Sequence, residues 1–206
     1  MRIQPLFFAS TVYYEQERFL SDAGTMLSLI RDIVPATTEL TEPVYLSSQA
    51  AVDAYLEKSS HATPLLVNLS GATQRWILSV AKASKRALLW WYFPGDQLFG
   101  ASVEDTIRQI VSKNAIPAVM DCWAHLRNRN IRIERVFDKS SLLEKCRLLS
   151  AMEKIRATRL LISGYTQQWV VSTSVDERWI EDRWGIQSVH IGLEELFAEY
   201  QEVPRD

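Results

Sequence analysis

Small and polar residues follow an apolar run of this chain in the arrangement that parallel α/β sheets use to hold ligands. The run at residues 65–69 leads into Ser70, Gly71 and Thr73, and a helical pattern begins at Gln74. Ligands of open parallel sheets bind outside the carboxyl ends of the strands, often where the strand order reverses. A glycine beside hydroxyl residues at a helix start can also offer free backbone amides to a ligand oxygen. Ser70, Gly71 and Thr73 are therefore candidate substrate-binding residues.

The same turn has a purely structural interpretation. Gly71 can supply a backbone conformation with positive φ, and Ser70 or Thr73 can cap the following helix. The turn contains neither GxGxxG nor GxxxxGKS/T, so dinucleotide binding and phosphate binding by a P-loop lack their residues. Ligand contact and simple chain reversal both stay open for this turn.

Three further loops carry candidates for the same kind of contact. They follow predicted strands at residues 87–93, 116–120 and 159–163. The candidate residues are Gln97, His125, Gly164, Gln167 and Trp169. Hydroxyls, amides and aromatic rings predominate in these loops, which suits a neutral ligand better than a nucleotide phosphate. We expect a small sugar or polyol.

Reactive residue types gather between Asp121 and His125. Cys122 and His125 could form half of a zinc site, but a tetrahedral site needs two further ligands and the chain offers no partner pair. A nucleophilic Cys122 would need a lowered thiol pKa and an oriented base, so the pattern favours a packed, small apolar residue. We assign no catalytic residue and no metal ligand, and His125 is kept as a candidate substrate contact.

Composition and charge argue against several classes of protein. The chain has 206 residues, 47% of them hydrophobic, and a formal net charge of -2 with Lys and Arg spread along it. Binding to nucleic acid or to an anionic membrane is therefore not expected. The longest apolar run, residues 87–94, is far shorter than the roughly 20 residues of a membrane-spanning helix, and no signal peptide is predicted. The two cysteines make no disulfide framework, which predicts a cytoplasmic protein.

Segments of strand length alternate with segments of helical period, which is the pattern of a doubly wound parallel sheet. We predict a flavodoxin-like or Rossmann-like α/β domain of three αβα layers over residues 1–137. Its predicted strands are residues 5–11, 43–47, 65–69, 87–93, 116–120 and 131–136.

Residues 138–206 are predicted to form a connecting helix and a partial second αβ domain of order β-α-β-α. Its strands are expected at residues 159–163 and 186–191. Ser174 and Glu177 have the spacing of a capping box, and Gly185 is a typical helix end. This remainder buries too little surface to be secure alone, so we expect it to pack on the first domain or on another subunit.

Two segments together resemble the L-fucose and L-arabinose isomerase-like family. In residues 159–196 a strand runs into a glycine turn, an aromatic residue, a helix and a second strand. The matching residues are Gly164, Trp169, Ser172 or Thr173, Asp176, Trp184-Gly185 and Glu195-Leu196. The turn at residues 70–74 resembles the Gly-Gly-Thr-Glu turn of the family's first domain, but it keeps only one glycine and the Thr, and Gln74 replaces the acid.

The resemblance implies the N-terminal region of an aldose-ketose isomerase, in which two flavodoxin-like or Rossmann-like domains precede a catalytic C-terminal domain. The family's reaction uses a divalent metal, commonly manganese, with ligands mostly from later sequence, so no cofactor is assigned to this chain. The resemblance further implies binding of a small sugar or polyol and assembly into a homo-oligomer. Such a chain is not expected to be catalytically complete alone.

Two other functions fit the same sequence. The αβ scaffold can serve oligomerisation or regulation without a reaction, and a flavodoxin-like sheet can bind a flavin or a nucleotide. All three functions stay open at the level of the sequence.

Overall fold

The chain folds into two compact units, Met1–Arg147 and Leu148–Asp206. The structure, a computed structural model, describes residues 1–58, 61–84, 86–91, 101–131, 133–164 and 176–203. The division between the units falls within the helix α6 (Lys139–Ala157). Each unit is described below by itself.

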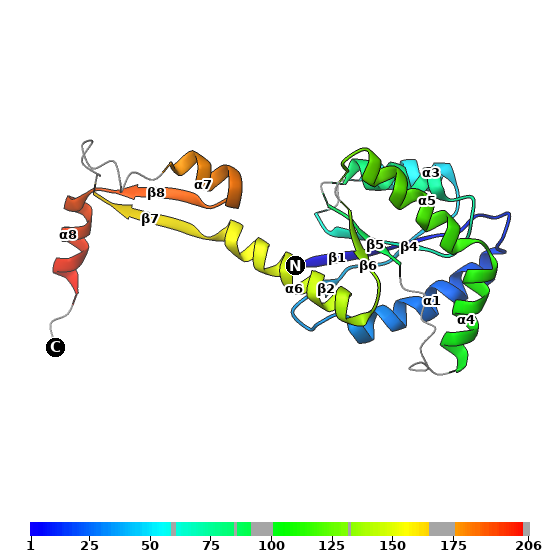
Figure 1. The fold of residues 1–206 in the computed structure, drawn as a ribbon. Coiled ribbons are helices and arrows are strands. Elements are labelled where there is room, and N and C mark those ends of the chain that lie inside the picture. The colour runs from blue at the N-terminus through cyan, green and yellow to red at the C-terminus, as the bar shows by residue number, and fades with distance from the viewer. Residues whose placement is uncertain (59–60, 85, 92–100, 132, 165–175, 204–206) are drawn as a thin grey trace. The chain divides into compact units, whose positions relative to one another are not determined.

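Unit 1 contains the predicted parallel sheet, with strand order β2-β1-β4-β5-β6 (Figure 1). The strands are β1 (Arg2–Phe8), β2 (Glu39–Leu40), β3 (Val44–Leu46), β4 (Thr63–Asn68), β5 (Leu88–Trp90) and β6 (Glu134–Val136). β2 and β3 both pair with β1, β2 near its start and β3 near its end. They act as one edge strand that is interrupted at residues 41–43. Counted in this way, the order is the 2-1-3-4-5 order of flavodoxin-like sheets.

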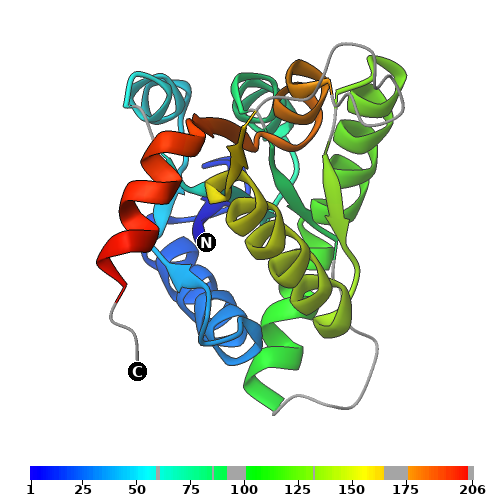
Figure 2. The same cartoon turned by 90° about the vertical axis from the view of Figure 1, so that its left-hand side faces the viewer.

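Helices cover both faces of this sheet, which confirms the predicted three-layer αβα architecture. They are α1 (Gln16–Ile33), α2 (Gln49–Leu56), α3 (Gln74–Ala83), α4 (Ala101–Ser112) and α5 (Ala115–Asn128). In both views α1 and α4 lie on one side of the sheet, and α3 and α5 lie on the other (Figures 1 and 2). The apolar stripe of α1 is buried and includes Phe19, Ala23, Met26 and Ile30. Because both faces are covered, β4 and β5 are continuous apolar runs rather than alternating ones.

A hydrophobic core lies between the sheet and the helices α3 and α5. Leu6 and Phe8 of β1 and Leu66 of β4 are fully buried there, against Ile77 of α3 and Val119 of α5. Cys122 belongs to the same core, as predicted, and burial raises the pKa of its thiol to about 12.

The predicted strand at residues 116–120 is wrong, because these residues lie in α5. An apolar run of this length suits a buried strand and a buried helix equally well. The decisive pattern continues beyond the run, where Cys122 and Leu126 follow Val119 at helical spacing and are buried with it. Pro117 is tolerated since it lies in the first turn, where the backbone amides need no partner within the helix.

Unit 2 has the predicted β-α-β-α order. Its elements are β7 (Arg159–Ser163), α7 (Glu177–Trp184), β8 (Gln187–Ile191) and α8 (Leu193–Glu202), and β7 pairs with β8 in parallel. The Asp176 carboxylate accepts from the Trp179 amide at 3.1 Å and so caps α7, whose start had been expected at Ser174, outside the described residues. Gly185 ends α7 with a φ of 72°. Across the described residues, each helix is too short or too polar to cross a membrane.

Candidate functional site

The strand order reverses between β1 and β4. From β1 the chain crosses to β2 and β3 on one side, and from β4 it continues to β5 on the other side. The carboxyl ends of two neighbouring strands thus diverge, which is the place where doubly wound sheets bind ligands. The loop after β1 and the turn at residues 70–73 after β4 meet here.

The polar side chains of the turn at residues 70–73 form hydrogen bonds within the protein. The Ser70 hydroxyl accepts from the Ser10 amide at 2.9 Å and donates to the Gly71 carbonyl at 3.0 Å. The Thr73 hydroxyl donates to the Asn68 side-chain oxygen at 2.7 Å, and all three of Asn68, Ser70 and Thr73 are buried. The hydroxyls therefore tie β4 to the loop after β1.

Gly71 allows two loops to approach closely. Its amide donates to the Lys113 carbonyl at 2.7 Å. A Cβ at this position would lie 3.1 Å from the Asn114 Cβ and 3.4 Å from the Tyr13 ring. The residue with positive φ in this turn is Ala72, at 60°, so Gly71 serves the close approach rather than the backbone conformation.

A buried carboxylate lies beside this turn. Asp22 of α1 is 1% exposed, accepts from the Tyr14 hydroxyl at 3.0 Å and pairs with the Arg18 Nε at 3.0 Å. Lys113, which follows α4, places its Nζ 4.0 Å from the same carboxylate and 3.2 Å from the centre of the Tyr14 ring. Asp22 is buried because it shares the inward face of α1 with Phe19 and Ala23.

Burial shifts the pKa values of two groups around Asp22, the Tyr14 phenol and the Lys113 ammonium. Desolvation, together with the charge and hydrogen bond of Asp22, raises the pKa of the Tyr14 phenol well above its usual value. Desolvation also lowers the pKa of the Lys113 ammonium, although Asp22 opposes that shift. Tyr14 therefore stays a hydrogen-bond donor at neutral pH.

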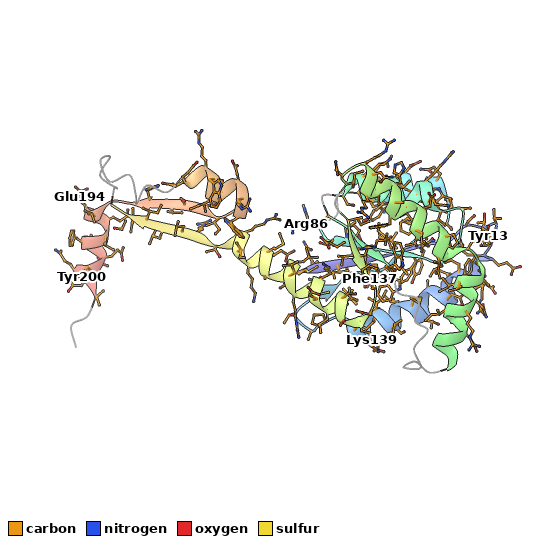
Figure 3. All side chains as sticks on the ribbon, in the orientation of Figure 1. Tyr13, Arg86, Phe137, Lys139, Glu194 and Tyr200 are labelled. Carbon is orange, nitrogen blue, oxygen red and sulfur yellow. The ribbon has the colours of Figure 1, made fainter. Side chains whose placement is uncertain are left out.

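Three neutral polar groups and one guanidinium form the outer rim of the site. The Asn114 side-chain amide donates to the Tyr13 hydroxyl at 3.2 Å, and the Arg18 guanidinium donates to the Gln109 side-chain oxygen. Asn114 and Arg18 are exposed, and Tyr13 is half-buried. Tyr13 lies at the side of unit 1 toward which β1 runs from the N-terminus (Figure 3). The switch-point cluster is defined as Tyr13, Tyr14, Arg18, Asp22, Gln109, Lys113 and Asn114.

The sequence did not identify this cluster, although it contained two signals. Tyr13 and Tyr14 lie in the loop between the first strand and the first helix, and Asp22 interrupts an otherwise apolar helix face at four residues from Arg18. The contribution of Lys113 and Asn114 was hidden, because the predicted strand at residues 116–120 left no direct junction between α4 and α5.

The structure brings together only part of the predicted site. Ser70, Gly71 and Thr73 lie in the turn at residues 70–73, which we call the switch-point turn, beside the switch-point cluster. Gly164 follows β7 in unit 2 with a φ of 81°. Gln97, Gln167 and Trp169 lie outside the described residues.

His125 follows no strand, because it lies on α5. Ten residues along a helix correspond to about 15 Å, so His125 is far from Ala115 and from the switch-point turn. Its Nε2 is buried and has no hydrogen-bond partner within the described part of the chain.

The described residues do not fit a divalent metal. They contain no group of three or more His, Cys, Asp or Glu side chains placed to hold an ion. Asp22, the buried carboxylate of the cluster, already receives a phenol and a guanidinium. We therefore derive no step through manganese.

The sequence matches no protein-family model and no curated protein.

Proposed function

We propose that unit 1 binds a small sugar or polyol at the switch-point cluster and carries out no reaction with its own residues. The observation that carries this proposal is the Asn114 to Tyr13 hydrogen bond of 3.2 Å at the rim, beside the closely packed Gly71. An amide and a phenol together offer donors and acceptors to neighbouring hydroxyl groups of a ligand.

The cations of the cluster already have a partner within the protein. Arg18 and Lys113 both lie near the Asp22 carboxylate, which leaves one net positive charge across the three groups. A nucleotide phosphate would have to compete with Asp22 for these cations. The resemblance of residues 70–74 and 159–196 to sugar isomerases points in the same direction, and the two buried free thiols support a cytoplasmic location.

Isothermal titration of the full chain with pentoses and deoxyhexoses, with and without manganese, tests the proposal. We expect heat from at least one sugar, with the same affinity in both conditions. Asn114→Gly preserves the left-handed backbone (φ 62°) and removes the amide, and Tyr13→Phe removes the phenol. Each should weaken binding about fivefold to tenfold, the range for one hydrogen bond.

Asn130→Gly is the matched control, because Asn130 is exposed in unit 1 with a φ of 55° and lies outside the cluster, so it should leave binding unchanged. The absence of binding heat with every sugar, or equal affinity of all variants for a sugar, would contradict the proposal. Stabilisation by flavin mononucleotide without any response to sugars would favour the flavin-binding alternative instead.

Exposed apolar side chains in unit 2 favour a second function, assembly into a homo-oligomer. Leu161, Trp179, Phe197 and Tyr200 are each more than half exposed. None of the described residues in 150–203 is buried, and a two-stranded sheet cannot provide a core by itself. We propose that these residues contact a second copy of the chain.

Light scattering across a concentration series tests this second function. The wild-type protein should be an oligomer, and Phe197→Ser with Tyr200→Ser should shift it toward the monomer. A wild-type protein that is monomeric at every concentration would contradict it.

A further inference from the structure

A cavity of about 530 Å³ lies along the edge of the sheet of unit 1, between α2 and the strands β1 and β3. Small-molecule sites of proteins span about 300 to 1,000 Å³. The interruption of the edge strand at residues 41–43 contributes to the opening, and Thr41 lines it. We propose that this cavity binds an organic carboxylate with a short apolar body.

The wall formed by β3 and α2 is apolar. Its side chains are Val44, Leu46, Ala51 and Ala54. Ala51 and Ala54 lie on α2 where larger residues would fill the space. This wall can contact the hydrocarbon part of a ligand. Removing that apolar surface from water favours binding.

Two uncharged polar groups lie between this wall and the solvent. The Tyr55 hydroxyl donates to the Gln4 side-chain oxygen at 3.4 Å, and the Gln4 amide donates to the Glu42 carbonyl at 3.3 Å. Both hydrogen bonds are longer than the usual 2.7 to about 3.2 Å, so a ligand oxygen can compete for these donors. Burial raises the pKa of the Tyr55 phenol, which keeps this donor protonated.

Basic residues from β1 and from the segment between α2 and β4 line the same cavity. Arg2 belongs to β1, Lys58 follows α2, and His61 precedes β4. The pairing of Ile3 with Thr63 places the starts of β1 and β4 side by side. None of the three basic side chains forms an ion pair to a carboxylate within the described part of the chain.

The charge at this cavity favours an anion. No Asp or Glu is among its described lining residues, and Glu39, the register neighbour of Arg2 on β2, lies outside the lining. A guanidinium and an ammonium both bind carboxylates through charge-assisted hydrogen bonds. The apolar wall distinguishes the expected ligand from a free inorganic anion.

The lining of the cavity shares no residue with the switch-point cluster. Its basic end lies at Arg2, six residues of extended strand, roughly 20 Å, before Phe8, whereas Leu46 of its apolar wall pairs with Phe8 itself. Binding of a carboxylate here can therefore succeed or fail independently of sugar binding there.

Titration calorimetry on the full chain tests this inference with benzoate and hexanoate as probes. Benzyl alcohol and hexanol are the matched neutral compounds, and inorganic phosphate is the matched anion without an apolar body. We expect both carboxylates to bind at least tenfold more tightly than their alcohols and than phosphate. Equal affinity of acid and alcohol, binding of phosphate alone, or no binding of either acid would overturn the inference.

Two variants place the ligand in the cavity. Ala54→Leu places a larger side chain in the cavity and should abolish binding. Leu is a good helix former and Ala54 is exposed, so the helix should stay intact. Lys58→Gln should weaken binding at least fivefold. Ala50→Leu is the matched control, because Ala50 is exposed on the same helix and lies outside the lining. Unchanged binding in Ala54→Leu, or equal loss in Ala50→Leu, would also overturn the inference.

Discussion

Asp22 is the residue on which the switch-point cluster depends most strongly. A carboxylate that is 1% exposed is stable only if its charge is compensated, and here Arg18 and the Tyr14 hydroxyl compensate it directly. Its neutral replacement would leave Lys113 beside the Tyr14 ring without the opposing charge.

We predict that Asp22→Asn lowers the free energy of unfolding by about 2 kcal/mol, in the range for losing hydrogen bonds to a buried charged group. Urea denaturation followed by circular dichroism measures the change. Asp53→Asn is the matched control, since Asp53 is exposed on α2 and its carboxylate accepts a hydrogen bond from the Gln49 side chain. It should change stability by less than about 0.5 kcal/mol. Equal effects of the two substitutions would contradict the role given to Asp22.

Both thiols of the chain should be unreactive in the folded protein. Burial raises the pKa of Cys122 to about 12 and that of Cys146 to about 11, and the reactive species is the thiolate. Ellman's reagent at pH 8 should therefore label neither cysteine in native protein and both in denatured protein. Rapid labelling of either native thiol would show that it is accessible.

The same shifts give a pH dependence with a defined sign. The folded state keeps both thiols protonated above the ordinary thiol pKa of 9.0. Their contribution to stability is therefore complete below pH 9 and is lost as pH rises from 9 toward about 12. In urea denaturation, Cys122→Ala should lose less stability than wild type between pH 9 and 10.5.

At the level of elements, the sequence predicts β1, β3, β4 and β5 as apolar segments between turn signals. It predicts β6 from residues 131–136, which follow the polar stretch at residues 127–130. It fails at α5, where an apolar run allows two assignments. The α4 to α5 junction is only Lys113 and Asn114, and Asn114 is in a left-handed conformation. Gly71 packs against this junction, where an added Cβ would lie 3.1 Å from the Asn114 Cβ. No local pattern shows it.

Asn114 therefore offers a test of the junction. A β-branched residue is strained at a φ of 62°, whereas glycine is not. Asn114→Val should lower the unfolding free energy by about 1 to 2 kcal/mol, and Asn114→Gly should leave it nearly unchanged. Equal stability of the two variants in thermal or urea denaturation would argue against the left-handed junction.

At the level of the whole molecule, the two units differ in how much apolar surface each one buries. Unit 1 buries apolar residues on both faces of its sheet, whereas unit 2 exposes most of its large apolar side chains. The sequence predicted this contrast from the small size of the remainder. It could not predict the switch-point cluster, because Lys113 lies far along the chain from Tyr14 and Asp22, and only the folded domain brings it to them.

We predict that residues 1–147 alone unfold cooperatively and that residues 148–206 alone do not. Differential scanning calorimetry of the two fragments measures this difference. A cooperative transition of the isolated, monomeric fragment 148–206 would show that unit 2 carries a sufficient core of its own.

Chemical-shift mapping tests the proposed sugar site most directly. In a nitrogen-15 correlation spectrum of the full chain titrated with L-arabinose or L-fucose, we expect the backbone amides of Tyr13, Gly71 and Asn114 to shift together and to saturate. Asn114→Gly should reduce the apparent affinity at the remaining two amides. Shifts confined to other parts of the chain, or no shifts up to high sugar concentration, would contradict sugar binding at the switch point.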